Sequence, residues 1–338
     1  MTARLRVGVV GAGAWGRNHV RTLASLPGAE LAAVCDTAPA VREKLARQDP
    51  AVLVTDDVAK LLSAVEAVVV ASPAITHAGI ARQAIAAGVP VLVEKPFALS
   101  VADAEDLAAR AAQANVPVMA GHLLEYHPVV ERLRELIAGG TLGQIYYLYG
   151  QRVNLGQVRR DENALWSFGP HDVSVALFLL GEAPRTVTAV GRSYLQQGIE
   201  DVVFLTMEFS SGALAHVQLS WLDPHKERRL TVVGSKQMAV FDDMQPREKL
   251  RLYDKGVDRP PEYQSFGESL QIREGDIFIP RLPNAEPLVQ ELTHFVRVAR
   301  REVAARSDAG DGVRVVRVLA AATESLRRDG QPIGVTVS

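Results

Sequence analysis

Leu5-Arg6-Val7-Gly8-Val9-Val10-Gly11-Ala12-Gly13-Ala14-Trp15-Gly16 is the most informative stretch of this 338-residue chain. Leu5 to Val10 is an apolar run of strand length, and a Gly-x-Gly-x-x-Gly pattern follows it immediately. Apolar residues at helical spacing come next, and Pro27-Gly28 ends that predicted helix. A second predicted strand runs from Ala29 to Val34 and leads to Asp36. A strand, the glycine pattern, a helix, a strand and an acid in this order are typical of a dinucleotide-binding Rossmann unit.

The glycines and the acid have separate predicted roles in such a unit. Gly11 permits the tight turn, Gly13 lets the backbone approach a pyrophosphate, and Gly16 allows close packing of the helix whose N-terminus receives that pyrophosphate. Asp36 lies 20 residues after Gly16, where a carboxylate accepts hydrogen bonds from the adenine ribose. Because a carboxylate repels a 2′-phosphate, the pattern favours NAD over NADP as the cofactor. The alternative, a glycine-rich turn without a ligand, does not explain the acid at this distance.

Strands and helices continue to alternate up to about residue 121, which gives six predicted strands. The alternation predicts an α/β fold with an N-terminal Rossmann domain built on a doubly wound parallel sheet. Ligands of such sheets bind at the carboxyl ends of the strands. The residues predicted to contact the cofactor at this edge or on the glycine-rich turn are Ala14, Trp15, Ser72, Pro73, His77, Glu94 and Lys95. For His77 taken alone, a surface position on a helix is the alternative.

Glu94-Lys95-Pro96 follows the predicted buried strand Val91-Leu92-Val93 and places a lysine at this edge. The proline disfavours helical backbone at Lys95 and holds it extended, and the Lys95–Pro96 bond could be cis. Taken alone, the segment also fits a solvated Glu–Lys pair on a loop. The dinucleotide pattern at the same edge of the sheet favours an active-site lysine instead.

After residue 121 the pattern changes to strands that look antiparallel. Asp201–Phe209 and Ala213–Trp221 flank Ser210-Ser211-Gly212, which indicates a hairpin. We therefore expect two domains, an NAD-binding Rossmann domain over 1–121 and a substrate-binding and oligomerisation α+β domain over 122–338. The second domain should contain an open, largely antiparallel sheet, and its last helix should pack back near the Rossmann domain. Helices of this domain are expected at 128–138, 164–180, 287–301 and 313–328.

The segment Gly169-Pro170-His171-Asp172 is the most informative part of the second domain. Because proline is a poor residue inside a helix, we expect a kink or a helix start at Pro170. His171 would then lie in the first turn of that helix and face the cleft between the domains. The alternative for a histidine before an apolar helix is a packed, hydrogen-bonded residue without a catalytic role.

Composition and charge exclude several kinds of partner. The net charge is −2, with 48% hydrophobic and 22% charged residues, so no strong field attracts nucleic acid or an anionic membrane. A single cysteine, Cys35, excludes an internal disulfide and fits a reducing compartment. No signal peptide or membrane-spanning run is recognisable, so we expect a cytoplasmic protein. His122, Glu125 and His127 match no zinc-binding spacing, so no metal is expected.

The glycine pattern at 11–16, Asp36, Glu94-Lys95-Pro96 and Gly169-Pro170-His171-Asp172 together resemble the Gfo/Idh/MocA oxidoreductase family, of the glucose–fructose oxidoreductase and inositol dehydrogenase type. The resemblance covers nearly the whole chain. It implies a homodimer or homotetramer formed through the sheet of the second domain. It also implies that Lys95 and His171 are the catalytic pair beside the nicotinamide.

One position departs from the family pattern. The family often carries an aspartate four residues before the histidine, and this chain has Ser167 there. A serine hydrogen-bonds an imidazole but does not hold an imidazolium by charge. Asp172 and Glu162 are the candidates to replace that aspartate.

The chemistry of alcohol oxidation fits this pair. The reaction needs a hydride acceptor, which is NAD, and a base for the hydroxyl proton. His171 is the candidate base because an imidazole titrates near neutral pH. Lys95 would orient the hydroxyl, polarise the developing carbonyl and share in the proton transfer if its pKa falls beside the cationic nicotinamide.

The resemblance implies a sugar, a cyclitol or a nucleotide-sugar as substrate. A basic loop after residue 151 could clamp a diphosphate, although a solvated surface loop is an equal alternative. The clamp favours a UDP-N-acetylglucosamine 3-dehydrogenase. The alternatives are a free cyclitol or aldose dehydrogenase and, from another class, a non-catalytic NAD-binding sensor or regulatory subunit. The predicted substrate contacts are Lys95, Arg152, Asn154, Arg159, Arg160, Trp166, Ser167, His171 and Asp172.

Overall fold

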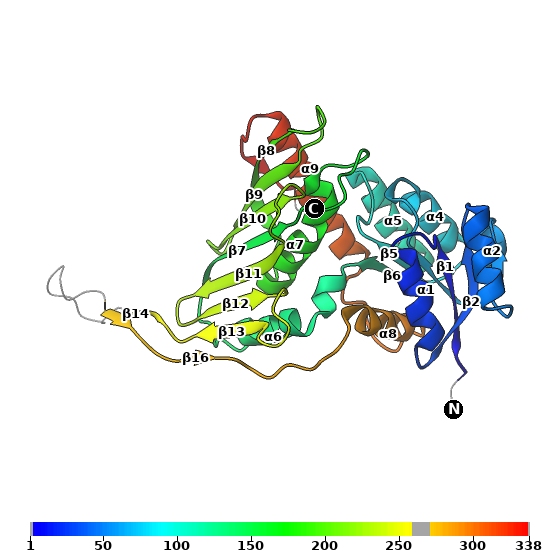
Figure 1. Cartoon of the computed structure of the whole chain (residues 1–338), viewed down its shortest axis with the longest axis horizontal. Helices are drawn as coiled ribbons and strands as arrows, with labels where there is room; N and C mark the ends of the chain where they lie inside the picture. Colours follow the sequence, from blue (N-terminus) through cyan, green and yellow to red (C-terminus); the bar gives the residue numbers. More distant parts are fainter. Residues whose placement is uncertain (1–2, 259–270, 337–338) are drawn as a thin grey trace. The chain divides into compact units, whose positions relative to one another are not determined.

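Figure 1 shows a computed structural model of the chain, which describes residues 3–258 and 271–336. The chain forms two compact units, residues 1–126 with 285–316 and residues 127–284 with 317–338. These units differ from the continuous segments 1–121 and 122–338 expected from the sequence. The difference arises because helix α8 (Pro287–Ala299) buries Leu288, Leu292 and Phe295 in the core of the first unit.

The sheet of the first unit has the strand order β3-β2-β1-β4-β5-β6, with parallel neighbours. This order confirms the predicted doubly wound sheet, because the chain starts at β1 in the middle, winds out to β3 and returns to β4 on the other side. Ligands bind where the winding reverses, here at the carboxyl ends of β1 and β4. The elements are β1 (Leu5–Val10), α1 (Gly16–Ser25), β2 (Ala29–Cys35), α2 (Pro39–Gln48), β3 (Leu53–Thr55), α3 (Val58–Leu62), β4 (Ala67–Val70), α4 (Ala74–Ala86), β5 (Val91–Glu94), α5 (Val101–Ala114), β6 (Val118–Gly121) and the 3-10 helix η1 (Leu123–Tyr126).

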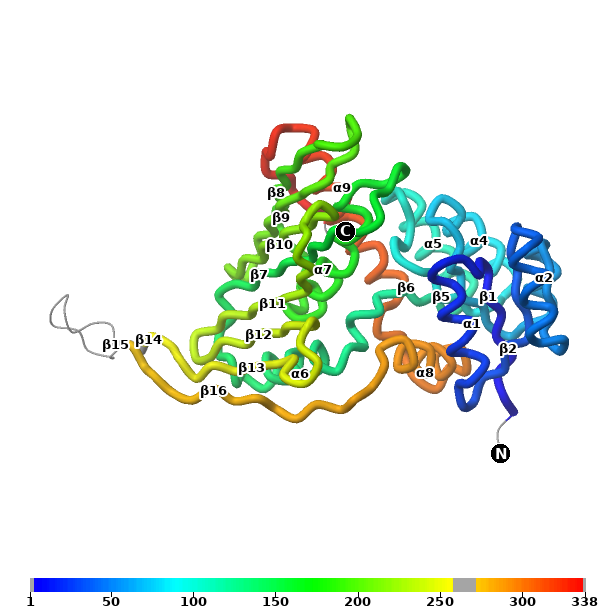
Figure 2. The backbone as a smooth tube through the Cα atoms, viewed as in Figure 1, coloured from blue at the N-terminus to red at the C-terminus, as the bar shows by residue number. Residues whose placement is uncertain are grey.

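The core of the first unit lies on both faces of this sheet. Val68 and Val69 of β4 point to opposite faces and are both buried, which explains why the strands form continuous apolar runs in the sequence. On one face, α8 packs beside α1, and Figure 2 shows the two helices in orange and blue. Leu23 of α1 and Phe295 of α8 belong to the same buried cluster. A helix more than 250 positions later in the chain therefore supports the helix that follows the glycine-rich turn.

The second unit contains a mixed sheet with the order β16-β13-β12-β11-β7-β10-β9-β8-β17. Most neighbouring strands are antiparallel and only β7 and β10 are recorded as parallel within the described sheet, so the predicted open, largely antiparallel sheet is confirmed. The predicted hairpin is β9–β10. The strands are β7 (Ile145–Val153), β8 (Pro184–Arg192), β9 (Val202–Phe209), β10 (Leu214–Ser220), β11 (Glu227–Gly234), β12 (Met238–Asp242), β13 (Leu250–Tyr253), β16 (Ile277–Phe278) and β17 (Ile333–Gly334).

The two faces of this sheet differ. Helix α7 (Ala164–Leu180) packs on β7, β9 and β10, and α6 (Pro128–Ala138) packs beside α7. The opposite face exposes large apolar side chains, among them Tyr147, Tyr149 and Phe204. Helix α9 (Ala309–Arg327) begins four residues earlier than expected, and its residues are divided between the two units.

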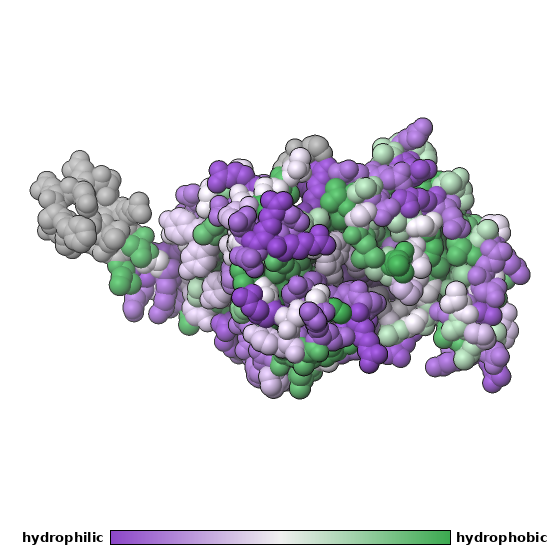
Figure 3. All heavy atoms as spheres, turned by 90° about the horizontal axis from the view of Figure 1, so that it is seen from above, coloured by the Kyte–Doolittle hydropathy of each residue, from purple (hydrophilic) through white to green (hydrophobic). Residues whose placement is uncertain are grey.

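A separate pair of strands, β14 (Gly256–Asp258) and β15 (Gln271–Arg273), lies outside both sheets. Val257 and Ile272 of this pair are exposed, and Figure 3 shows an apolar patch at this end of the second unit, on the left. Within residues 3–258 and 271–336, none of the helices combines the length and the apolar composition needed to cross a bilayer.

Helix α7 is continuous, and Pro170 lies inside it. Its bounds confirm the helix expected at 164–180, so of the two alternatives at Pro170 the helix start is wrong, and His171 lies in the middle of the helix rather than in its first turn. The helix begins after Asn163, whose side-chain oxygen accepts the Trp166 backbone N–H at 3.1 Å. Pro170 removes the N–H that would pair with the carbonyl of Trp166, but α7 is buried along most of its length and that packing keeps the helix continuous.

Alanine at Gly16 should destabilise the protein, whereas alanine at Gly13 should not. A Cβ on Gly16 would lie 1.9 Å from the carbonyl oxygen of Gly11, whereas a Cβ on Gly13 meets nothing within 4 Å. We expect Gly16→Ala to lower the free energy of unfolding by at least about 2 kcal/mol, and Gly13→Ala to change it by less than about 1 kcal/mol. Urea unfolding followed by circular dichroism measures both changes, and equal losses would contradict the packing described for this turn.

Candidate functional site

The carboxyl ends of β1 and β4 bring the glycine-rich turn against the segment after β4. Gly11 has a φ of +89°, and a Cβ there would lie 2.6 Å from backbone atoms of Ser72. Only glycine allows both this backbone conformation and this approach. Ser72 Oγ lies 2.6 Å from Thr76 Oγ1 at the start of α4. The turn predicted to receive a pyrophosphate is therefore closely packed against the Ser72-Pro73 segment.

Asp36 lies at the end of β2 beside the same turn. Its Oδ2 accepts the Ala12 backbone N–H at 2.8 Å, and its Oδ1 accepts the Ala38 backbone N–H at 2.8 Å. The Arg42 guanidinium donates to the backbone carbonyls of Asp36 and Thr37 at 2.9 Å each. The Asp36 carboxylate is thus fixed in position, and each oxygen keeps a further lone pair that could accept a ribose hydroxyl.

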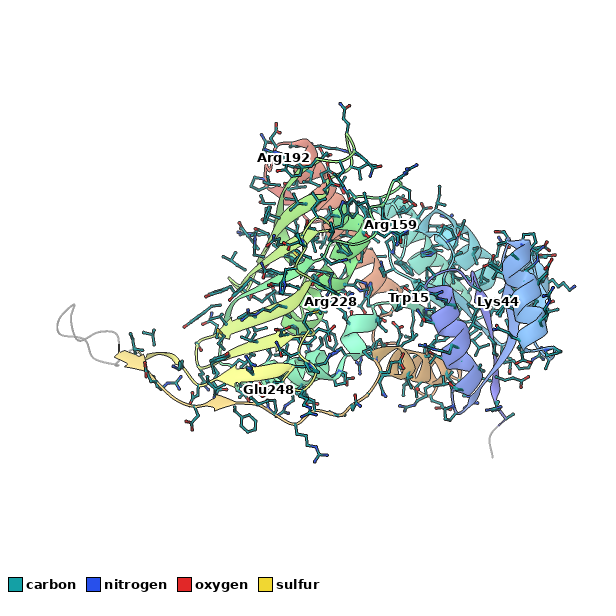
Figure 4. All side chains as sticks on the ribbon, in the orientation of Figure 1. Trp15, Lys44, Arg159, Arg192, Arg228 and Glu248 are labelled. Carbon is teal, nitrogen blue, oxygen red and sulfur yellow. The ribbon has the colours of Figure 1, made fainter. Side chains whose placement is uncertain are left out.

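The Glu94 carboxylate accepts hydrogen bonds from separate parts of the first unit. Its Oε1 accepts the Trp15 indole N–H at 2.5 Å and lies 2.7 Å from His19 Nε2, while its Oε2 accepts the Lys95 backbone N–H at 3.1 Å. Trp15 directly precedes α1, where Figure 4 labels it, and His19 follows four residues later on the same helical face. One carboxylate therefore connects the glycine-rich turn and α1 to the segment Glu94-Lys95-Pro96, which we call the Lys95 corner.

Glu94 is held as an anion although only 5% of it is exposed. Burial alone would raise its pKa, but the hydrogen bonds from His19 and Trp15 and the positive charge of Lys95 outweigh burial and place the pKa below the usual range. His19 is fully buried beside it. The carboxylate already bonds protein donors through both oxygens, and its predicted contact with the cofactor stays a prediction.

His77 of α4 also contacts the Lys95 corner. Its Nδ1 lies 2.9 Å from the Pro96 carbonyl and its Nε2 lies 2.8 Å from the Ser72 carbonyl. The histidine is buried, so the alternative of a surface helix position is wrong. The Lys95–Pro96 bond is cis, and Lys95 is partly buried. His77 therefore joins the Lys95 corner to the segment after β4, and its direct contact with a cofactor stays a prediction.

A second buried carboxyl lies in α8. Glu291 is 0% exposed, and within the described part of the chain neither of its side-chain oxygens has a hydrogen-bond partner. Burial, and then repulsion by Glu94 and Glu125, raises the pKa of Glu291 well above its ordinary value. The fold therefore favours an ionised Glu94 and a neutral Glu291.

In the second unit, Asp172, the residue after His171, forms an ion pair with Arg152. Arg152 Nε donates to Asp172 Oδ2 at 2.5 Å, and Arg152 Nη2 donates to Asp172 Oδ1 at 3.2 Å. Arg152 lies on β7 rather than in the loop where it was expected. His171 itself is partly buried, and Ser167 is buried one turn earlier in α7. Whether Asp172 or Glu162 replaces the aspartate that the family often carries stays a prediction.

The structure does not bring the predicted arginines to a common partner. Arg159 pairs with Glu162 at 3.6 Å, whereas Arg152 pairs with Asp172. Arg159 and Arg160 are exposed in the segment after β7, and Asn154 is partly buried there. The Trp166 indole N–H, another predicted substrate contact, donates to Thr323 Oγ1 of α9 at 3.0 Å. The predicted diphosphate clamp therefore stays a prediction.

Two residues near these sites were not predicted from the sequence. His19 lies four residues after Trp15, so helical spacing was a signal that could have identified it. Arg228 of β11 lies opposite Arg152 in the strand register, which the sequence alone does not reveal. Lys95 belongs to the first unit and His171 to the second, and their pairing stays a prediction from the family resemblance. Across residues 3–258 and 271–336, no three His, Cys, Asp or Glu side chains are grouped so as to hold a metal ion.

Neutralising Glu291 should make stability less dependent on pH. Because the folded state holds this proton more tightly than the unfolded chain, its stabilising effect is complete below the ordinary carboxyl pKa of about 4.3 and is lost as the pH rises towards the folded value. We expect Glu291→Gln to match the wild type near about pH 4 and to become more stable than it at higher pH, by up to about 1.4 kcal/mol per pH unit.

Urea unfolding at several pH values measures this difference. Glu286→Gln is the matched control, since Glu286 precedes the same helix, is exposed and makes only a 3.7 Å contact with Arg21 among its recorded ion pairs. A difference between Glu291→Gln and the wild type that stays constant with pH would contradict the assignment of a buried neutral carboxyl.

Comparison with known families gives two matches in chain order. Residues 5–122 match a model described as an oxidoreductase family with an NAD-binding Rossmann fold. Residues 130–240 match the GFO/IDH/MocA C-terminal domain. The two models together cover more than half of the chain.

Individual relatives agree with these matches. The chain is 29% identical over 263 residues to a UDP-N-acetylglucosamine 3-dehydrogenase of Acidithiobacillus ferrooxidans, covering 76% of this chain and 79% of the relative. It is 33% identical over 234 residues to an inositol 2-dehydrogenase of Streptomyces avermitilis, covering 65% and 66%. GenD2 from gentamicin A biosynthesis, solved in complex with NAD, superposes with a TM-score of 0.83 at 29% identity and covers 100% of this chain and 98% of its own.

The Rossmann sheet with its glycine-rich turn and the sheet that follows it thus both have counterparts, in the same order, in one known group of proteins. The chain belongs to the Gfo/Idh/MocA oxidoreductase family, as its motifs predicted, and its first domain is an NAD-binding Rossmann domain.

Proposed function

We propose that this protein is an NAD-dependent dehydrogenase of a sugar secondary alcohol, and that its substrate is a nucleotide-activated sugar such as UDP-N-acetylglucosamine, oxidised at C3. The observation that carries the proposal is the buried Glu94 carboxylate, which bonds the Trp15 indole of the glycine-rich turn and the Lys95 backbone. A lysine held in a fixed position relative to the cofactor-binding turn is what a positioned hydride transfer requires.

The proposed roles follow from the chemistry of each group. Bound NAD supplies the hydride acceptor. His171 takes the hydroxyl proton of the substrate, because an imidazole is neutral and basic near physiological pH. The Lys95 ammonium donates a hydrogen bond to the same oxygen and stabilises the negative charge that develops on it. The pairing of these two residues from different units is part of the proposal.

Asp36 supports NAD rather than NADP as the cofactor. Its carboxylate is fixed at the end of β2 by the backbone N–H groups of Ala12 and Ala38. A 2′-phosphate on the adenine ribose would meet this negative charge, whereas ribose hydroxyls could donate to it.

The choice of a nucleotide-sugar is supported by the 29% identity to a UDP-N-acetylglucosamine 3-dehydrogenase over 76% of the chain. The alternative of a free cyclitol or aldose is supported by the 33% identity to an inositol 2-dehydrogenase over 65% of the chain. A panel of UDP-N-acetylglucosamine, UDP-glucose, myo-inositol and D-glucose with NAD, followed by absorbance of the reduced cofactor, distinguishes them. Turnover of inositol alone would replace our first choice of substrate.

We also propose that the protein forms a homodimer or homotetramer through the sheet of the second unit. Tyr147, Tyr149 and Phe204 expose apolar surface on the face opposite α7. Burying such a face against a second copy is a common solution for an open sheet. Light scattering of the purified protein measures the mass of the assembly, and a monomer at micromolar concentration would overturn this part of the proposal.

Removing either catalytic group should slow turnover without releasing the cofactor. We expect Lys95→Met and His171→Asn each to lower kcat by about 10²–10⁴-fold, because each removes a group that acts on the reacting oxygen. NAD affinity, measured by calorimetry, should change little in both variants. Gly13→Ala should show the opposite pattern, with weakened NAD binding, because its Cβ occupies the space of the pyrophosphate.

Lys60→Met and His225→Asn are the matched controls, since both side chains are exposed and neither belongs to the proposed site. Losses below tenfold in both Lys95→Met and His171→Asn would overturn the dehydrogenase proposal. NAD binding that persists with no turnover of any sugar in the wild type would favour the non-catalytic sensor.

A further inference from the structure

Two arginines of the second unit face each other across neighbouring strands. In the antiparallel register of β7 and β11, Arg228 lies directly opposite Arg152. Side chains of such a pair point to the same face of the sheet, and the bonding of Arg152 to Asp172 of α7 identifies it as the α7 face. Figure 4 labels Arg228 near the start of β11. Like charges in this arrangement repel each other unless an anion lies between them.

The carboxylates near Arg228 are already used by other cations. Both oxygens of Asp172 bond Arg152. Asp243 lies 2.5 Å from the Lys249 ammonium and 3.5 Å from His127 Nε2. Arg228 Nη1 lies 3.9 Å from Asp243 Oδ2, and this is the ion-pair contact recorded for Arg228 among the described residues. The carboxylates of Asp172 and Asp243 are therefore shared by three permanently charged side chains, Arg152, Lys249 and Arg228. Of these, Arg228 makes the longest contact.

The side chain of Arg228 is partly covered, and 45% of it is exposed. Burial of the remainder, and then the charge of Arg152, lower the pKa of its guanidinium, while Asp243 and Asp172 only partly oppose this. A guanidinium without a close carboxylate can present a fork of N–H donors to an oxyanion, which suits a phosphoryl group or a carboxylate.

The position of the pair connects it to the proposed substrate site. Asp172, which bonds Arg152, is the residue directly after His171 in α7. An anion bound by Arg228 and Arg152 would therefore lie near the helical turn that carries the proposed base. Arg159 and Arg160, the other arginines predicted to contact the substrate, are exposed in the segment after β7, and Arg159 has Glu162 as its partner.

We propose that Arg228, together with Arg152, binds an oxyanion of the substrate and so makes the enzyme select charged sugars over neutral ones. The inference rests on the proposed dehydrogenase function, because it concerns the substrate of that site. The oxyanion is a phosphoryl group of a nucleotide-sugar or a carboxylate of a sugar acid. Both present paired oxygens to a guanidinium fork, so the substrates in the experiment distinguish them.

Arg228→Met tests the inference in the full-length, NAD-bound protein. We would measure kcat and KM for UDP-N-acetylglucosamine, D-glucuronate and myo-inositol. The expected result is a KM at least about tenfold higher for the anionic substrate with kcat little changed, because a charged hydrogen-bonding partner is lost from binding. A KM for myo-inositol that does not change, and partial recovery in Arg228→Lys, would complete the supporting pattern. A loss confined to UDP-N-acetylglucosamine assigns a phosphoryl group, and one confined to D-glucuronate assigns a carboxylate.

Arg192→Met is the matched control, since Arg192 is an exposed arginine of β8 whose guanidinium donates to the Gly191 carbonyl. Unchanged KM values in Arg228→Met, or equal increases for charged and neutral sugars, would overturn the anion site while the dehydrogenase proposal stands. If the wild type oxidises none of the three, the dehydrogenase proposal loses its support. Calorimetric binding of the same compounds then tests whether Arg228 binds an anion. Binding that weakens in Arg228→Met then supports the site, and binding that does not weaken overturns it.

Discussion

A carboxylate buried in a protein must be compensated by hydrogen bonds and positive charge. Glu94 is such a carboxylate, and it places this constraint on the edge of the first unit's sheet where the strands have their carboxyl ends. Leaving such a charge unpaired would cost several kcal/mol, so its partners have to keep their positions. Those partners are the Trp15 indole, the His19 imidazole and the Lys95 backbone N–H. Through them, the glycine-rich turn predicted to approach the cofactor and the proposed catalytic lysine become parts of one arrangement, which positioned catalysis requires.

The surrounding fold keeps this arrangement in place by different means. Gly16 packs so closely on Gly11 that no side chain fits between them, and His77 connects the Lys95 corner to the Ser72 carbonyl. Helix α8 packs beside α1 and carries Glu291, which is buried and favoured in its neutral form. Because Glu291 is neutral, Glu94 is the ionised carboxyl of these two. Their environments move the two pKa values apart, downwards for Glu94 and upwards for Glu291.

Much of this could be predicted because local sequence patterns determine it. The order of strand, glycine pattern, helix and acid predicted the doubly wound sheet, and Ser210-Ser211-Gly212 predicted the β9–β10 hairpin. What could not be predicted depends on contacts between distant segments. The packing of α8 in the first unit, the burial of His77 and the position of Arg228 opposite Arg152 follow from tertiary packing and strand register. A helix start at Pro170, one of the two alternatives expected there, is wrong because the local cost of proline in a helix is outweighed by the burial of α7.

A double-mutant cycle between Trp15 and Glu94 tests the central claim most directly. Trp15→Phe removes the indole N–H donor, Glu94→Gln removes the charged acceptor, and urea unfolding followed by circular dichroism measures both variants and their combination. If the buried carboxylate holds the turn, the double variant loses less stability than the two single losses predict, by about 1 kcal/mol or more. Losses that add independently would contradict the account, because Glu94 would then not connect the glycine-rich turn to the Lys95 corner.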